Sequence, residues 1–327
     1  MRLLKPIYDH DSYSNPIARE IFLLFEAEIF SPLLALVKTE REKFNSSSAL
    51  EAALRSGAIQ YDGEFFKGNL KSAISKDLRA IGAVYNHTRK AYKLEIARVP
   101  QNIKQAIVDG KMQTAAVVKK IEDYLKAMEG REIKVTGIGT HLEKAFGKLD
   151  AQFQQTTKVI TARDIEIPLQ DKFKEQLKDA YTENLDLYIQ NWYDEQILRL
   201  REKVYQNVAE GYRAENLVET IMSERDVSKR KAVFLAKQET SLMVSNYREL
   251  RYKDIGVSKY QWSTSHDVRV RQDHRDLNGQ IFDWEHPPIT NKQTGARNNP
   301  GEDFGCRCIA VPCLPDRDLL GRKYANK

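Results

Sequence analysis

The chain has 327 residues, of which 41% are apolar and 30% charged, and its net charge is +6. This size allows buried cores and one to three domains. The nearly balanced charge is not typical of a dedicated nucleic-acid-binding protein. The early apolar run IFLLFEAEIF is far shorter than the ~20 residues that a membrane span needs, and no leader segment is expected. Three clustered cysteines argue against a secreted disulfide framework, so we expect a chain that folds in a reducing cytoplasm.

The N-terminal part predicts helices separated by short breaks. Asn15-Pro16 opens a helix of about 25 residues in which Pro32 should cause a kink or a split. Ser48 belongs to a serine-rich break that can cap the next helix. Asp62-Gly63 then stands between two short apolar runs, which predicts a β-hairpin near residues 58–67.

A long amphipathic helix is the clearest predicted element. Apolar residues recur every three or four positions, which predicts a single helix over about residues 168–210. Such a stripe can form a coiled-coil seam or a peptide-binding face, but packing against neighbouring helices is the simpler explanation. The residues of the stripe are Leu169, Phe173, Leu177, Tyr181, Leu185, Tyr188, Trp192, Ile197, Leu200, Val204 and Val208.

The predicted fold class is mainly α. An elongated helical body should occupy residues 1–256 and carry the short β-hairpin in its N-terminal half. A small α+β module should follow at 257–315, and residues 316–327 form a polar tail. Within the module we expect strands at 257–264, 280–284 and 309–311.

Residues that bind metals or fix small irregular folds are concentrated between Trp262 and Cys308. This window holds three of the six histidines, two of the three tryptophans and two of the three cysteines. A short helix ending at Asn278-Gly279 would place Asp267, Arg271 and His274 on one face. Asp267 would cap that helix and pair with Arg271. Asp267 and His274 would lie about 10 Å apart along the helix axis.

Cys306 and Cys308 are the strongest candidates for metal ligands. Side chains two residues apart in an extended segment point to the same face, and a disulfide between residues so close is strained. Together with His274, the two thiols would supply three ligands of a zinc site. The fourth ligand would be Cys313, His266 or His286.

A purely structural reading of the same window stays open. Free cysteines are often small buried hydrophobic residues. The module would then be held by Trp262, Trp284 and the Asp267–Arg271 pair, with all thiols reduced.

The pattern W-S-T, D-x-R-V-R-x-x-H-x-x-L-x-G, a proline-bearing loop and C-R-C resembles the C-terminal domain of the phage Mu F-like minor head proteins, also called the SPP1-type head morphogenesis family. The resemblance covers about residues 215–315, including the lead-in Leu235–Thr240, and a weaker one covers about 50–110. The residues that carry the motif are Trp262, Asp267, Arg269, Arg271, His274, Leu277, Gly279, Cys306, Arg307 and Cys308.

The resemblance implies a non-enzymatic, low-copy head protein of a tailed double-stranded DNA phage. Such proteins are associated with the portal vertex inside the head and act in head assembly and in DNA packaging or delivery. The implied partners are the portal protein, the major capsid or scaffolding protein and the viral DNA, with no membrane. The chain would be found in the host cytoplasm during assembly and then in the virion.

Two other classes of function remain to be tested. The first is a metal-dependent nuclease or other hydrolase that uses His274, Asp267 and the cysteines, although no second carboxylate–histidine pair accompanies them. The second is a DNA-binding protein, which the near-neutral charge and the lack of a basic and aromatic stripe disfavour.

Overall fold

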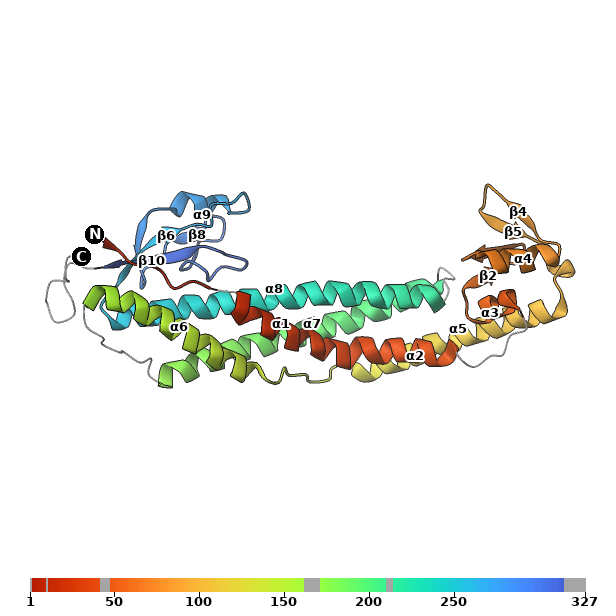
Figure 1. Ribbon diagram of the computed structural model, residues 1–327, viewed down its shortest axis with the longest axis horizontal. Helices are drawn as coiled ribbons and strands as arrows, with labels where there is room; N and C mark the ends of the chain where they lie inside the picture. Colours follow the sequence, from red (N-terminus) through yellow and green to blue (C-terminus); the bar gives the residue numbers. More distant parts are fainter. Residues whose placement is uncertain (1, 10, 42–47, 162–170, 210–213, 315–327) are drawn as a thin grey trace. The chain divides into compact units, whose positions relative to one another are not determined.

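Helices dominate the structure, which confirms the predicted mainly α fold with small antiparallel sheets. The computed structural model describes residues 2–9, 11–41, 48–161, 171–209 and 214–314 (Figure 1). The predicted polar tail lies outside the described residues. Within them, no helix is both long enough and apolar enough to traverse a lipid bilayer.

The chain divides into two compact units, each assembled from segments that are distant in sequence. The predicted body of residues 1–256 is shared between the two units, whereas the predicted module lies in unit 1. Unit 1 comprises Met1–Phe22, Ile133–Ile189 and Arg230–Lys327, and unit 2 comprises Leu23–Glu132 and Gln190–Lys229.

Long helices supply most of the buried residues. The helix predicted over residues 168–210 is α7, and its apolar stripe is buried at Leu177, Tyr181 and Leu185. The expected Tyr188 is instead 44% exposed, and Ile189 is buried in its place because the stripe advances in steps of four residues. The long helices are α1 (Asp11–Phe25), α2 (Ser31–Arg41), α5 (Gln101–Met128), α6 (Ile138–Thr161), α7 (Asp171–Ala209) and α8 (Ala214–Asp254).

Pro32 divides the first helical stretch as expected, and the division takes the form of a π-helical turn. Helix α1 begins at Asp11, earlier than predicted, and a π-helix over Glu26–Phe30 connects it to α2. Pro32 has no N–H to donate to the preceding turn. The carbonyl oxygen of Glu28, four residues before Pro32, accepts a hydrogen bond of 2.6 Å from the hydroxyl of Tyr124 on α5.

Replacing Tyr124 with phenylalanine should therefore destabilise unit 2. The change removes one hydroxyl and leaves the Glu28 carbonyl without this donor, which costs about 1–2 kcal/mol of unfolding free energy. In a Pro32→Ala background the restored N–H can take over, so Tyr124→Phe should cost clearly less there. Urea unfolding of the wild type, the two single variants and the double variant measures both costs, and equal costs in the two backgrounds would contradict this account.

Part of unit 2 is a small α/β layer with the strand order β2-β3-β5-β4. The predicted hairpin is its β2–β3 pair, in which Asp62 Oδ1 accepts from the backbone N–H groups of Glu64 and Phe65 and Gly63 has φ +106°. Ser48 caps the preceding helix by accepting from the N–H of Glu51 at 3.1 Å. The elements are α3 (Ala49–Arg55), β2 (Ile59–Tyr61), β3 (Phe65–Gly68), α4 (Ser72–Ala80), β4 (Val84–Asn86), β5 (Ala91–Lys93) and a 3-10 turn η2 (Ile96–Arg98).

Helix α5 lies unusually close to α3 at Gly110. A Cβ atom at this position would be 2.1 Å from the carbonyl oxygen of Leu54, which is a backbone atom and cannot rotate away. Around this contact the α/β layer encloses its own core of apolar residues. They come from α3, the β2–β3 and β4–β5 strand pairs and the start of α5, and they include Leu50, Tyr61 and Phe66. Glycine is therefore required at position 110 for packing.

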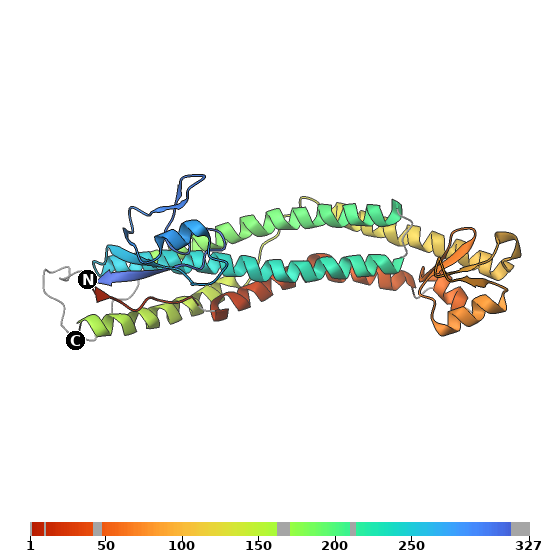
Figure 2. The same ribbon diagram turned by 90° about the horizontal axis from the view of Figure 1, so that it is seen from above.

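The C-terminal module of unit 1 is a four-stranded antiparallel sheet in the order β1-β10-β6-β7. The N-terminal strand completes it, because Leu3 pairs with Cys313. Figures 1 and 2 show the module lying along the C-terminal half of α8, where Ser245 donates to the carbonyl of Pro300 at 2.8 Å. The elements are β1 (Arg2–Leu3), β6 (Lys259–Ser263), α9 (Gln272–Leu277), β7 (Ile281–Asp283), β8 (Ile289–Asn291), β9 (Ala296–Arg297) and β10 (Ile309–Leu314).

Candidate metal centre

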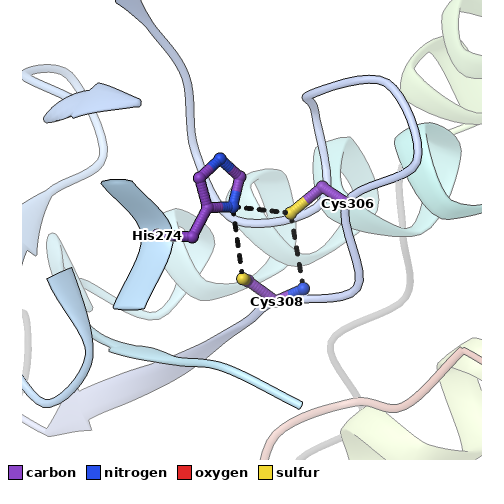
Figure 3. Close-up of side chains that lie close together, drawn as sticks. All are labelled: His274, Cys306 and Cys308. Atoms are coloured by element: carbon purple, nitrogen blue, oxygen red, sulfur yellow. Dashed lines mark hydrogen bonds between the residues drawn. The ribbon is translucent and has the colours of Figure 1, made fainter. Parts of the chain in front are cut away.

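Three predicted ligands converge inside the module. His274 lies on α9, and Cys306 and Cys308 lie in the extended segment that leads into β10 (Figure 3). All three are buried, with exposed fractions of 2%, 6% and 5%. Among the described residues they form the cluster whose ligand atoms all lie within 4.8 Å of one another.

The distances within the cluster suit a shared ion. Nδ1 of His274 is 3.5 Å from Sγ of Cys306 and 3.5 Å from Sγ of Cys308. One ring nitrogen carries a single proton or a single lone pair, so it cannot make two good hydrogen bonds at once. A tetrahedral zinc ion with bonds of about 2.3 Å to sulfur and about 2.0 Å to nitrogen would separate these atoms by about 3.5 Å. The cluster can therefore supply three ligands to a metal ion.

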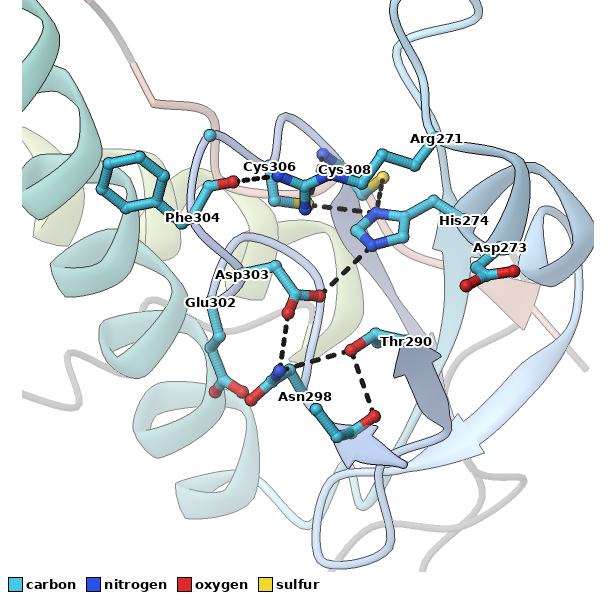
Figure 4. Close-up of polar contacts among 12 residues, drawn as sticks. Arg271, Asp273, His274, Thr290, Asn298, Glu302, Asp303, Phe304, Cys306 and Cys308 are labelled. Carbon is cyan, nitrogen blue, oxygen red and sulfur yellow. Dashed lines mark hydrogen bonds and ion pairs between the residues drawn. The ribbon is translucent and has the colours of Figure 1, made fainter. Parts of the chain in front are cut away.

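The other ring nitrogen of His274 faces a carboxylate. Its Nε2 is 3.2 Å from Oδ2 of Asp303, and Oδ1 of Asp303 accepts from the side-chain amide of Asn298 at 2.7 Å (Figure 4). A histidine that binds a metal through one nitrogen usually donates the other N–H to such an acceptor. Asp303 and Asn298 were not predicted from the sequence, because a loop rich in polar residues gives no sign of which one meets a histidine.

The same contacts shift the protonation equilibria of the cluster. The Asp303 carboxylate, 3.2 Å from Nε2, followed by the contact with Cys306, raises the pKa of His274 to about 9. The contacts with Cys308 and His274 lower the pKa of Cys306, whereas the neighbouring Cys306 raises the pKa of Cys308. One thiol is therefore favoured as the thiolate, which is the form that binds metal ions.

The three candidates for a fourth ligand lie elsewhere. Cys313 is on β10 opposite Lys259, and its buried thiol points to the carbonyl of Val311 at 3.9 Å. His266 contacts Thr264, and the backbone N–H of His286 bonds to Asp283. Among the described residues Cys313 is not part of the cluster, because β10 begins at Ile309 and its pairing with β6 and β1 holds Cys313 in the sheet.

The predicted pair of Asp267 and Arg271 is replaced by another pair. The helix begins only at Gln272, so Asp267 caps a turn by accepting from the N–H of Arg269 at 2.9 Å. Its carboxylate binds both terminal nitrogens of Arg307, which lies between the two cysteines, and this ion pair keeps the pKa of Asp267 below its usual value. Arg271 instead donates to the carbonyl of Phe304.

Trp262 and Gly279 contact the histidine helix and its end. The Trp262 side chain is fully buried, and its ring meets that of His274 edge-on, with 5.4 Å between centroids. Gly279 has φ +80°, and its N–H donates to the carbonyl of Trp262 at 2.8 Å. The turn after α9 is thus joined to β6, which fixes the position of His274.

Comparison with known proteins agrees with the motif. Residues 199–311 match the model of the family described as Phage Mu protein F like protein, which confirms the resemblance for this part of the chain. An uncharacterized protein of Haemophilus influenzae is 30% identical over 122 residues, which cover 37% of this chain and 26% of that protein. The chain thus matches about a quarter of the length of that relative. No solved structure matches the chain.

Proposed function

We propose that this chain, whose residues 199–311 match the model of the phage Mu F-like family, is a structural minor head protein of a tailed double-stranded DNA phage. The shared motif between Trp262 and Cys308 is the observation that carries the proposal. The protein would act in head morphogenesis and in packaging or delivery of the DNA, without an enzymatic step. It would reside in the host cytoplasm during assembly and inside the virion head, at the portal vertex, afterwards.

The portal protein is the partner that we propose first. Helix α7 carries Leu198 and Tyr205, which are 58% and 71% exposed and two helical turns apart. Exposed apolar side chains on one helix face suit docking to another protein. The major capsid or scaffolding protein and the viral DNA are further candidate partners.

We also propose that zinc is the ion of the His274, Cys306 and Cys308 cluster. Two thiolates and an imidazole are ligands that zinc prefers, and the Asp303 contact gives the histidine its expected second partner. Because all three ligands are buried, the ion would fix the fold of the module. It would tie the segment before β10 to α9.

A pull-down with the portal protein of the encoding phage tests the proposed function. The chain should bind the portal and should be detected by mass spectrometry in purified heads. Leu198→Glu combined with Tyr205→Glu should weaken portal binding at least tenfold, whereas Val84→Glu, at a 69% exposed apolar residue of β4, should not. A folded chain that is absent from heads and does not bind the portal would refute the proposal.

The burial of the cluster supports a structural role over the hydrolase alternative. A catalytic zinc needs an open position that substrate and water can reach. His274 and both cysteines are each less than 7% exposed, which favours a structural ion. Nuclease activity that disappears in a folded His274→Ala variant would overturn this choice, and DNA binding without portal binding would favour a DNA-binding protein.

A further inference from the structure

The two ring nitrogens of His274 have different neighbours, and the difference determines how the histidine can bind a metal. Nδ1 faces the sulfur atoms of Cys306 and Cys308, at 3.5 Å from each, and Nε2 faces Oδ2 of Asp303 at 3.2 Å. An ionised carboxylate only accepts hydrogen bonds, so Nε2 must carry a proton to interact with it. In neutral imidazole Nδ1 is then left with the lone pair, directed at the two sulfurs.

Asp303 is itself fixed by further contacts. Its side chain is 14% exposed, and its Oδ1 accepts from Asn298 at 2.7 Å. The same amide of Asn298 donates to the hydroxyl of Thr290 on β8 at 3.2 Å, so the β8–β9 hairpin supports the carboxylate (Figure 4). Asp303 therefore lies beside the proposed ligands as a fixed partner of His274.

We propose that Asp303 is a positioning residue of the metal site, which selects Nδ1 of His274 as the ligand atom. This inference rests on the proposed zinc site and adds to it the ligand atom and the residue that selects it. The carboxylate holds the ring at one angle, keeps the proton on Nε2 and makes Nδ1 a stronger donor. Loss of such a partner typically weakens metal binding by about 10–100-fold.

The proposal is tested by the zinc affinity of the full chain. This affinity is measured by competition with a chromophoric chelator at pH 7.5. Asp303→Asn keeps the shape of the side chain but removes its charge, and it should weaken Zn²⁺ binding about 10–100-fold. Asp303→Glu restores the carboxylate and should recover part of the affinity. The matched control is Asp273→Asn, because Asp273 neighbours His274 on α9 but its carboxylate pairs with Lys292 at 3.6 Å. That variant should keep the wild-type affinity.

A second measurement separates positioning from a general effect on stability. In the zinc-loaded wild type, ¹⁵N NMR of the His274 ring should show a proton on Nε2 and the metal on Nδ1. If Asp303→Asn binds Zn²⁺ as tightly as the wild type, or if the metal is on Nε2, the positioning role is refuted while the zinc site stands. A wild-type protein that takes up no Zn²⁺ refutes the zinc site itself and this inference with it.

Discussion

The Cys306→Ser variant is expected to lose zinc and to unfold unit 1 at a temperature lower by on the order of 10 °C or more. Wild-type protein should contain about one zinc ion per chain, because one cluster of His274 and two cysteines supplies three ligands. Structural zinc contributes directly to folding free energy, so its removal should weaken the link between α9 and β10. Elemental analysis and thermal unfolding followed by tryptophan fluorescence measure both effects.

Cys313→Ser is the matched control for this experiment. Cys313 is as buried as Cys306, at 3% exposure, but its thiol points to the backbone carbonyl of Val311 at 3.9 Å. Any general cost of burying a hydroxyl instead of a thiol is shared by both variants. Zinc content should therefore stay at the wild-type value in Cys313→Ser. Wild-type protein without zinc, and with the same melting temperature after chelation, would refute a metal-stabilised module.

Gly110→Ala is expected to destabilise the α3–α5 contact by about 3 kcal/mol, the upper end of the usual cost of overpacking. The added Cβ would be 2.1 Å from the Leu54 carbonyl oxygen, so the two helices must separate. The preference of helices for alanine offsets about 1 kcal/mol of this overpacking cost, so the measured net destabilisation should be about 2 kcal/mol. Hydrogen exchange of peptides from α3 and α5 should become faster, while that of the C-terminal module should stay unchanged.

Gly147→Ala measures the helix preference alone. Gly147 lies in α6, and a Cβ there would meet no other atom within 4 Å. Alanine at this position should therefore stabilise its helix by about 0.5–1 kcal/mol. Opposite signs at Gly110 and Gly147 would establish that contact with Leu54, and not glycine's flexibility, determines the effect. A neutral Gly110→Ala would contradict the close approach of α3 and α5.

Local patterns in the sequence were enough to predict the first helical stretch, α7 and the β2–β3 hairpin. The stripe from Leu177 to Val204 identified α7, because helical periodicity depends only on neighbouring positions. The Asp62-Gly63 turn identified the β2–β3 hairpin for the same reason. The replacement of Tyr188 by Ile189 in the core could not be predicted, since both choices fit a spacing of three or four residues.

The candidate metal site was predicted in part. Cys306 and Cys308 are close in sequence, and His274 was the candidate on a nearby helix, so these three could be proposed together. The contact between Asp303 and His274 was missed, because only the folded conformation of the loop before the cysteines brings these two residues together. Likewise Arg307 replaced Arg271 as the partner of Asp267, since the first turn of the expected helix does not form. Tertiary contacts decided each of these cases.

The pairing of β1 with β10 bears on the order in which the protein folds during synthesis. Leu3 can pair with Cys313 only after about three hundred further residues have been synthesised. The α/β layer of unit 2 consists of neighbours in sequence, so its low contact order allows it to fold early. Unit 1 becomes complete only when the C-terminal strand has left the ribosome. In a nascent chain arrested before β10, the α/β layer should therefore resist proteases. The C-terminal module that packs along α8 should remain accessible to them.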